Sequence, residues 1–355
     1  MRIIDKTKPV LVTGGTGYLA SWIIKMLLED GIDVHATVRD PSDGSKVEHL
    51  KALGEASKAQ LKLYRADLMD SGSFDEAMQG CELVIHTAAP FFITGIKDAE
   101  EELIRPALGG TKNVLEAVNR TATVKRVVLT SSVVAIFGDN ADIELAPGGI
   151  FTEKEWNVTS SAGHQPYSYA KTAAEKAAWE IVGKQDRWDL LTINPGWILG
   201  PSLSKRNDST SIRIMIEFAD GTYKRGVAEL WHGIVDVRDA AAAHIKAGYT
   251  PEASGRHIIV SEEATLLDIA NILRKHFGDD YPFPKKQAPK LMFWLIAPLF
   301  GFTRNYVSKN AGVKIKFDNS YSNADLKLSY IPLEQTVKEH FQQILDDGLL
   351  EKTSG

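Results

Sequence analysis

A glycine-rich turn near the amino terminus limits the folds open to this 355-residue chain more than any other feature. The turn, residues 13–20, follows an apolar run at 9–13 and opens an amphipathic helical pattern at 18–30. A second β-branched run, 33–39, comes directly after that helix. Strand, glycine turn, helix and strand in this order predict a βαβ unit with two parallel strands. The N–H groups at such a helix start lack partners within the helix, so the turn is suited to a bound phosphate.

The small residues of this turn occupy the positions that a dinucleotide requires. Gly14 permits a tight turn with dihedral angles that other residues avoid, and Gly17 lets the backbone approach a pyrophosphate. Ala20 is small where the helix packs on the strand. An ordinary tight turn is the plain alternative, but the surrounding βαβ unit favours a dinucleotide. The expected contacts in the turn come from Thr13, Gly14, Thr16, Gly17, Tyr18 and Leu19.

The alternation of strand and helix continues to about residue 200 and sets the predicted fold class. Further strand-like runs end near Ala66, Thr87, Thr130 and Ile193, with helical patterns between them. This order predicts an α/β fold, a Rossmann-type doubly wound parallel sheet, whose ligands bind beyond the carboxyl ends of the strands. The pattern loosens after residue 200, so we expect a smaller C-terminal substrate-binding domain. The expected boundaries are 1–200 with 226–260 for the Rossmann domain, and 201–225 with 261–355 for the substrate-binding domain.

The end of the second strand discriminates between NAD and NADP. An acidic residue there favours the ribose hydroxyls of NAD, and a cation favours the 2′-phosphate of NADP. The chain has Arg39, whose planar guanidinium suits a phosphate, and Lys46 follows a little further on. Asp40 could instead turn inward and accept from a ribose, and both cations could be solvated surface charges. We predict NADP(H), held by Arg39 and Lys46.

A Tyr-x-x-x-Lys pattern supplies the candidate acid for reducing a carbonyl group. Positions i and i+4 share one face of a helix, and a lysine ammonium beside a tyrosine lowers the pKa of the phenol. The pattern occurs twice, but the copy at 281–285 contains two prolines and cannot be helical. The copy formed by Tyr167 and Lys171 follows Pro166 and opens a run rich in Ala, Glu and Lys. We therefore expect the catalytic pair there.

A serine at the end of a neighbouring strand would complete this group. Residues 127–132 read as a strand that ends in Ser131 and Ser132. A hydroxyl at this place could hold the carbonyl oxygen and share a proton network. The two side chains point to opposite sides of a continuing strand, so we expect only one of them to serve. Serines at strand ends also occur simply as turn formers.

Together with the segments 194–201 and 234–241, these motifs occur in an order that resembles the extended short-chain dehydrogenase/reductase family over nearly the whole chain. The stretch 38–41, with Lys46, is similar to the dihydroflavonol-reductase-like branch of that family. This branch includes cinnamoyl-CoA reductases and microbial aldehyde and ketone reductases. The resemblance implies an NADPH-dependent oxidoreductase that passes a hydride to a carbonyl compound.

The resemblance also implies roles for individual residues. Tyr167 would be the general acid, Lys171 would bind the nicotinamide ribose and lower the pKa of the tyrosine, and Ser132 would orient the carbonyl, with Ser131 in reserve. Further cofactor contacts are implied for Asp67, Leu68, Thr87, Ala88, Ala89, Ser131, Pro195 and Ile198.

The expected substrate is a small hydrophobic or aryl aldehyde or ketone. Plant dihydroflavonol reductases carry a polar residue shortly after the strand-end serine, where this chain has the apolar run 133–137. Plant cinnamoyl-CoA reductases carry a motif with Trp and Cys around the tyrosine, which 164–169 lacks. The apolar stretch 291–302 is expected to form a buried helix or a wall of the pocket, with a membrane-surface element as the alternative. Pocket-lining side chains are expected from Phe91, Phe92, Phe137 and Trp197.

Composition restricts the partners. A formal net charge of −5 gives no global preference for nucleic acid or an anionic membrane, and we expect neither. One cysteine suits a reducing cytoplasm, and the histidines show no metal-ligand spacing, so no metal is expected. A homodimer is possible.

A hydroxysteroid dehydrogenase or a sugar-nucleotide epimerase of the same family is the alternative enzyme, although Arg39 and Lys46 argue against an epimerase. An NADP(H)-sensing binding protein is the alternative of another class, which the Tyr167 and Lys171 pair disfavours.

Overall fold

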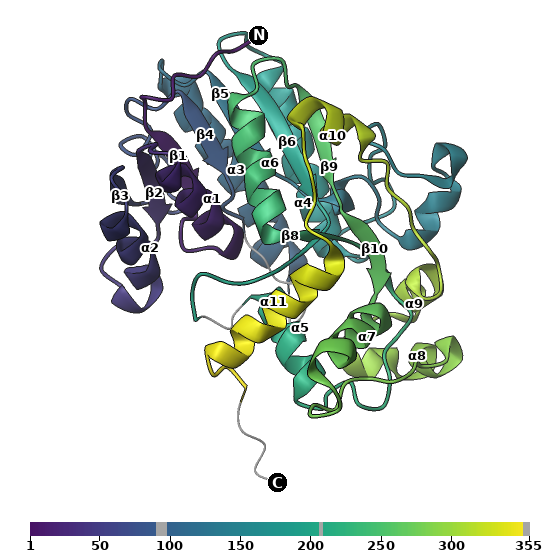
Figure 1. The fold of residues 1–355 in the computed structure, drawn as a ribbon. Helices are drawn as coiled ribbons and strands as arrows, with labels where there is room; N and C mark the ends of the chain where they lie inside the picture. The colour runs from purple at the N-terminus through teal and green to yellow at the C-terminus, as the bar shows by residue number, and fades with distance from the viewer. Residues whose placement is uncertain (90–97, 206–208, 351–355) are drawn as a thin grey trace.

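The centre of the protein is a seven-stranded parallel sheet (Figure 1). The computed structural model describes residues 1–89, 98–205 and 209–350. In the sheet the strands lie in the order β3-β2-β1-β4-β5-β6-β9, and each neighbouring pair is parallel. Their bounds are β1 Val10–Thr13, β2 Val34–Val38, β3 Leu61–Arg65, β4 Leu83–His86, β5 Arg126–Thr130, β6 Asp189–Pro195 and β9 Gly255–Ile259.

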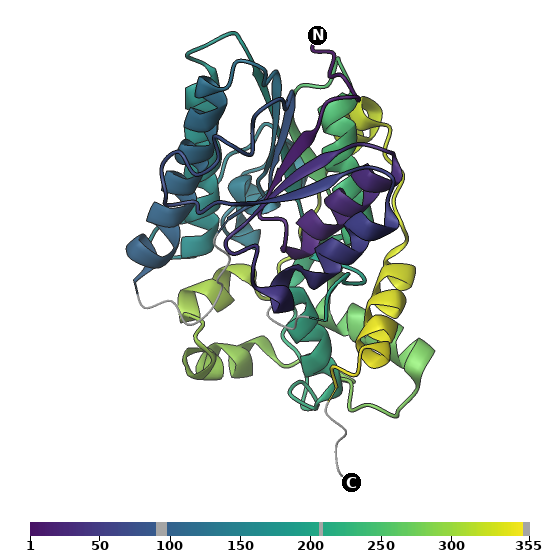
Figure 2. The ribbon, with the colours of Figure 1, turned by 90° about the vertical axis from the view of Figure 1, so that its left-hand side faces the viewer.

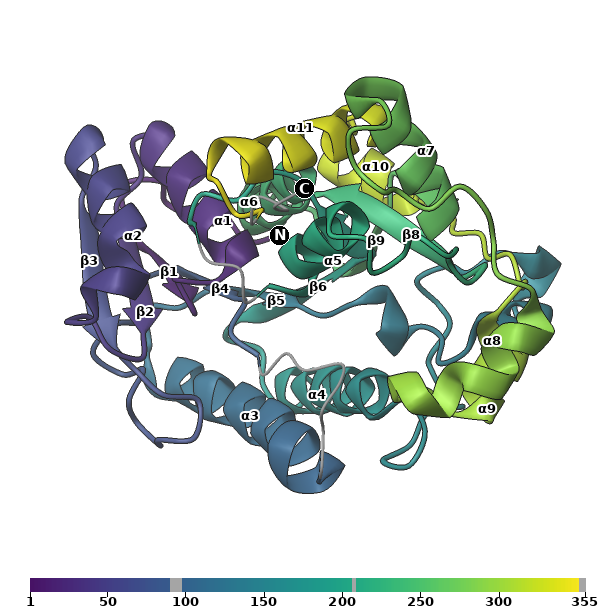
Figure 3. The ribbon, with the colours of Figure 1, turned by 90° about the horizontal axis from the view of Figure 1, so that it is seen from below.

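Helices cover both faces of this sheet, as Figure 3 shows from below. The helices α1 (Tyr18–Glu29), α2 (Gly44–Ala56) and α6 (Val237–Tyr249) lie on one face, and α3 (Arg105–Arg120) and α4 (Pro166–Val182) lie on the other. Because helices cover both faces of the sheet, β1, β2 and β4 are buried at every position. A strand alternates polar and apolar residues only where one face of its sheet contacts solvent. The predicted doubly wound fold is confirmed.

A three-stranded sheet extends the fold beyond the carboxyl ends of the main strands. It has the order β10-β8-β7, with β7 at Trp197–Leu199, β8 at Trp231–Asp236 and β10 at Glu262–Thr265. The chain enters β7 through Gly196, where a Cβ atom would lie 2.3 Å from the carbonyl oxygen of Gly233. Only glycine allows this approach. The helices α5 (Thr210–Ala219), α7 (Leu266–Phe277) and α11 (Leu333–Asp346) share one apolar cluster with this sheet.

Short helices complete the carboxyl-terminal part: the first two lie at the lower end of the molecule in Figure 2, and the third packs beside β9 at the opposite end. They are α8 (Lys290–Ile296), α9 (Arg304–Asn310) and α10 (Ser320–Leu326). A π-helical turn, η1 (Glu100–Ile104), leads into α3. The 3₁₀ turns are η2 (Val133–Ala135), η3 (Asn140–Glu144), η4 (Pro147–Gly149) and η5 (Ala297–Phe300).

The apolar stretch 291–302 differs from the expected buried helix. It forms α8 and η5, and no side chain of α8 is fully buried. Phe293 and Trp294 turn inward and pack on the cluster around Val307 and Leu230, while Leu291 and Leu299 remain 70% and 84% exposed. A helix of seven residues has only one side against the protein, so its remaining apolar side chains face outward. Among the described residues, no helix is both long and apolar enough to cross a membrane.

Candidate active site

The predicted catalytic residues converge where the parallel strands end. Helix α4 begins at Pro166, whose fixed φ suits the first helical position, and Tyr167 and Lys171 lie one turn apart on it. The ammonium of Lys171 donates a hydrogen bond to the carbonyl oxygen of Thr130, 3.1 Å away at the end of β5. Ser131 and Ser132 follow Thr130 directly. Lys171 therefore lies beside the strand end that carries the two serines, and the catalytic roles of these residues stay predictions.

The two serines have different surroundings. Ser131 is buried, and its hydroxyl donates to the carboxylate of Glu175 inside the protein. Ser132 is half-buried, and its Oγ accepts from the N–H of Val134 at 3.3 Å, at the start of η2. A weak donation to the carbonyl oxygen of Pro195, at 3.5 Å, leaves its proton easily redirected. These contacts favour Ser132 over Ser131 as the hydroxyl that meets a substrate.

Glu175 joins α4 to the strands of the main sheet. Its carboxylate accepts from Asn194 on β6 at 2.9 Å and from Arg256 on β9 at 2.6 Å. Glu175 is 1% exposed and Arg256 8%, so this is a buried ion pair whose partners must both be present. The guanidinium of Arg256 also stacks on the ring of Trp156 at 3.8 Å. Sequence analysis missed Glu175, although it lies one turn beyond Lys171 on the same helix face.

Burial is the largest influence on the pKa values of the predicted catalytic pair, Tyr167 and Lys171. Desolvation raises the pKa of Tyr167 well above its ordinary value, opposite to the direction expected from a neighbouring lysine. Desolvation lowers the pKa of Lys171 to about 8, against the negative charge of Glu175, which raises it. Tyr167 is therefore a protonated phenol at neutral pH, and Lys171 is a cation that can lose its proton within the physiological range.

A polar network fixes the residues just before Tyr167. Gln165 has the left-handed backbone angle φ = 56°, and its amide donates to Asp139 at 2.9 Å. His164 Nε2 lies 2.8 Å from the same carboxylate, and Asn310 of α9 donates to it at 2.7 Å. Burial acts to raise the pKa of Asp139, but hydrogen bonds from Asn310, His164 and Gln165 hold it below its ordinary value. Sequence analysis assigned His164 no special role, and only the fold brings Asp139 and Asn310 to it.

The glycine turn fits a bound pyrophosphate. Gly14 has φ = 68°, and a Cβ atom there would lie 3.1 Å from the Cα atom of Ala88. A Cβ on Gly17 would lie 3.1 Å from the carbonyl oxygen of Gly14. Gly17 is also the N-cap of α1, and it offers no side chain to the first N–H groups of the helix. The turn thus has the close backbone packing and the open helix start that a phosphate requires.

Thr13 joins this turn to the neighbouring strand end. Its Oγ1 accepts from the N–H groups of Thr87 and Ala88 at 3.2 and 3.1 Å, so its own proton goes to Nδ1 of His86 at 2.8 Å. This assigns the proton of the neutral imidazole to Nε2. Burial lowers the pKa of His86 to about 3, with the charge of Lys171 acting in the same direction. His86 is a supporting residue that sequence analysis did not single out.

The charged residues that follow β2 have different surroundings. Oδ1 of Asp40 accepts from the N–H and the hydroxyl of Ser42 at 2.9 and 2.6 Å. These two hydrogen bonds lower its pKa. Lys46 forms an ion pair with Asp43 at 3.0 Å, whereas Arg39 is exposed at the strand end. Asp40 is thus held to Ser42 through one oxygen, Lys46 is paired and Arg39 is exposed; the roles of Arg39 and Lys46 toward a cofactor stay predictions.

The other expected cofactor residues line the same edge of the sheet. Tyr18 donates its hydroxyl to Gly200, and Thr87 donates to the carbonyl of Thr13 at 2.5 Å. Asp67 is exposed, and its carboxylate accepts from the N–H of Met69 at 2.8 Å. Leu19 and Pro195 are buried, Thr16, Leu68, Ala88 and Ile198 are half-buried, and Ala89 is exposed. Their roles toward a cofactor stay predictions.

The aromatic residues expected at the substrate divide into three groups. Phe137 is buried and stacks on Phe151 at 4.7 Å, within a cluster that also contains Phe317. Trp197 is half-buried and donates from its indole nitrogen to Ser211 of α5 at 3.1 Å. Phe91 and Phe92 lie outside the described residues.

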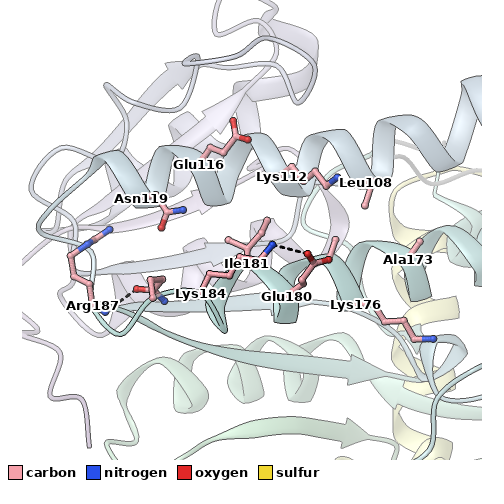
Figure 4. A pocket seen from close by; sticks show the side chains of 12 residues that line it. Leu108, Lys112, Glu116, Asn119, Ala173, Lys176, Glu180, Ile181, Lys184 and Arg187 are labelled. Carbon is pink, nitrogen blue, oxygen red and sulfur yellow. Dashed lines mark hydrogen bonds and ion pairs between the residues drawn. The ribbon is translucent and has the colours of Figure 1, made fainter.

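A groove of about 850 Å³ lies away from this site, between α3 and α4 (Figure 4). Its lining mixes apolar atoms with Lys112, Glu116, Lys176 and Glu180, and none of the predicted catalytic residues lines it. The groove therefore takes no part in the catalytic arrangement described above. Whether the protein forms a homodimer stays a prediction.

Comparison with known proteins establishes the family. The sequence profile of the NAD dependent epimerase/dehydratase family matches residues 10–261. The chain therefore belongs to this family, the extended short-chain dehydrogenases/reductases, and the predicted membership is confirmed.

Individual relatives place it near the predicted branch. Over 339 residues, which span 94% of this chain and 95% of the relative, it is 37% identical to the cinnamoyl-CoA reductase CAD2 of Medicago truncatula. It is 34% identical to a bifunctional dihydroflavonol 4-reductase/flavanone 4-reductase of Malus domestica, over 79% of this chain and 80% of the relative. The crystal structure of the yeast methylglyoxal/isovaleraldehyde reductase Gre2, complexed with NADPH, aligns with a TM-score of 0.75 at 28% identity, over 95% and 98% of the two chains.

The close packing at Gly14 gives a test of the glycine turn. The Gly14→Ala variant should lose about 1–2 kcal/mol of unfolding free energy from its left-handed backbone, and it should also bind dinucleotide more weakly because Ala88 must move. Gly31→Ala is the matched control, since Gly31 has φ = 76° and nothing lies within 4 Å of its added Cβ. Chemical denaturation and cofactor titration of both variants measure the two effects. Equal cofactor affinity in the two variants would contradict the role of the turn.

Proposed function

We propose that the protein is an NADPH-dependent carbonyl reductase that acts on small hydrophobic or aryl aldehydes and ketones. The observation that carries this proposal is the convergence of Ser132, Tyr167 and Lys171 at the strand ends, beside a turn that fits a pyrophosphate. The reductases among its relatives and the NADPH in the structure of yeast Gre2 support the same activity and cofactor.

In the proposed reaction each residue acts on a defined atom. When bound, NADPH supplies the hydride that reaches the carbonyl carbon. Ser132 orients the carbonyl oxygen through its Oγ, and Tyr167 donates its phenolic proton to that oxygen as the alcohol forms. Because its pKa is raised, Tyr167 stays protonated until hydride transfer makes the carbonyl oxygen of the substrate more basic. Lys171 replaces the proton and holds the nicotinamide ribose through its ammonium.

The substrate-binding part is proposed to comprise 201–225 and 261–355, which follow the Rossmann strands in the chain. Trp197 lies where these segments meet the strand ends, in the apolar cluster shared by β7, α5 and α11. This apolar setting supports a hydrophobic carbonyl substrate. Cys81 is buried and free, which fits a reducing compartment, so we also propose a cytoplasmic location.

The two alternatives make different predictions in a simple assay. A sugar-nucleotide epimerase would show no net oxidation of added NADPH by aldehydes, and a hydroxysteroid dehydrogenase would prefer steroid alcohols over a panel of small carbonyls. An NADP(H)-sensing protein would bind the cofactor without turnover. The engaged carboxylate of Asp40 and the exposed Arg39 favour NADPH over the tightly held NAD of an epimerase.

Replacing the catalytic phenol tests the mechanism. Tyr167→Phe should lower kcat by about 100- to 10,000-fold, the usual contribution of a general acid, while NADPH affinity stays close to that of the parent. Tyr169→Phe is the matched control, because Tyr169 is two residues away and 38% exposed. Initial rates and cofactor fluorescence titration measure both quantities. Substantial activity in Tyr167→Phe would refute the assigned role.

Replacing the strand-end cation tests the cofactor preference. Arg39→Ala should reduce kcat/KM for NADPH by about 10- to 150-fold, the value of a charge-assisted hydrogen bond, and leave kcat/KM for NADH nearly unchanged. Lys51→Ala, an exposed cation of α2, is the control and should change neither. If the parent enzyme used NADH and NADPH with equal efficiency, the assignment would fail.

The pKa of Lys171 predicts the alkaline limb of the pH profile. Its ammonium is present below its pKa of about 8 and is lost as pH rises through that value, so kcat/KM for reduction should decline above about pH 8. In Lys171→Arg the side chain stays charged to far higher pH, so the residual activity should show no such decline. Steady-state rates between pH 6 and 10 provide the measurement. A flat profile in the parent enzyme would contradict the role of Lys171.

A further inference from the structure

The segment that contains α8 and η5 concentrates exposed apolar side chains. Twelve large hydrophobic side chains are well exposed in the described part of the chain, and five of them fall within residues 291–300. We call these five the apolar face: Leu291, Met292, Leu295, Leu299 and Phe300, with exposed fractions of 70, 43, 55, 84 and 63%. Contiguous exposed apolar surface of this kind marks contact with another apolar body.

The apolar face projects from a support that is itself packed. On the inner side, Phe293 and Trp294 join the cluster that contains Leu230, Ala297 and Val307. Arg304 stacks on the ring of Trp294 at 4.6 Å, and Lys290 donates to the carbonyl oxygen of Ser308 at 3.0 Å, which joins α8 to α9. One apolar side of α8 therefore packs on the protein, and a second apolar side is exposed.

The sequence segment that carries this face has charges of one sign. Residues 285–316 contain seven basic residues and no acidic residue, whereas the rest of the chain has 34 basic and 46 acidic residues. Among the described residues, Lys285 and Lys309 pair with Asp279 and Asp139. Lys286, Lys290 and Arg304 are exposed at either end of the apolar face. An apolar strip flanked by cations is the chemistry that recognises an anionic lipid surface.

We propose that the apolar face, with Lys286, Lys290 and Arg304, docks the protein reversibly on the surface of an anionic bilayer. The apolar side chains would enter the boundary between headgroups and acyl chains, and the cations would contact the headgroups. A second copy of the chain is a poorer occupant, because two such segments would bring like charges together. The proposal goes beyond the carbonyl reductase activity and differs from the sequence-based expectation that the protein has no membrane partner.

Binding of the full-length protein to lipid vesicles tests the proposal without any assay of turnover. The parent protein should co-sediment with vesicles that contain phosphatidylglycerol, bind far less to pure phosphatidylcholine, and dissociate as salt rises. Leu299→Ser with Phe300→Ser should weaken binding at least about 30-fold, from two lost apolar insertions. Lys286→Ala with Lys290→Ala should weaken it roughly 30-fold, since each cation near an anionic surface contributes about fivefold.

Matched controls separate this face from general stickiness and from misfolding. Ile3→Ser with Met69→Ser removes two exposed apolar side chains elsewhere, and Lys51→Ala with Lys58→Ala removes two exposed cations of the Rossmann part. Both controls should bind like the parent, and every variant should keep the parent's thermal unfolding midpoint. Absence of vesicle binding, equal binding to neutral vesicles, or unchanged binding in Leu299→Ser with Phe300→Ser would each overturn the proposal. A dimer that this variant abolishes, without vesicle binding, would assign the face to a second copy.

Discussion

The arrangement of the active site depends on the buried carboxylate of Glu175. It receives hydrogen bonds from Ser131 on the loop after β5, from Asn194 on β6 and from Arg256 on β9. One side chain of α4 therefore fixes the helix against three successive parts of the sheet. Loss of either Glu175 or Arg256 would leave an unpaired charge in the interior, at a typical cost of about 3–5 kcal/mol. Arg256 lies on β9, which begins only at Gly255. The ion pair between α4 and the sheet therefore needs a strand that comes much later in the chain.

The same carboxylate links the architecture to the chemistry. Desolvation favours the neutral forms of both Tyr167 and Lys171, and the charge of Glu175 acts to keep Lys171 protonated. Burial and charge thus oppose each other at Lys171 and leave its pKa near neutrality, where a proton relay works best. In the proposed mechanism, the residue that holds the helix in place therefore also contributes to the pH range over which Lys171 stays charged.

The fold could be predicted from the sequence because its signals are local. The βαβ unit around Gly14, the β-branched runs and the helix that opens at Pro166 each follow from spacing within about thirty residues. The partners of those elements could not be predicted, because Arg256, Asp139 and Asn310 reach the site only through the tertiary fold. The different surroundings of Ser131 and Ser132 could not be predicted for the same reason, because Glu175 reaches Ser131 only in the folded chain. The apolar stretch 291–302 was misread as a buried helix, since composition alone does not say how many sides of a helix find a partner.

Helix α9 contacts both the helix that carries the apolar face and the polar network beside Tyr167. Its residue Asn310 donates to Asp139, and Asp139 in turn holds His164 and Gln165, which immediately precede Pro166 and Tyr167. Helix α8 packs on α9 through Phe293, Phe302 and Val307. Helix α8 is therefore connected to the residues before α4 through α9 and Asp139. Since Asp139 is fully buried and its partners are fixed by geometry, this chain of contacts joins the surface that we assign to lipid to the residue that we assign to proton transfer.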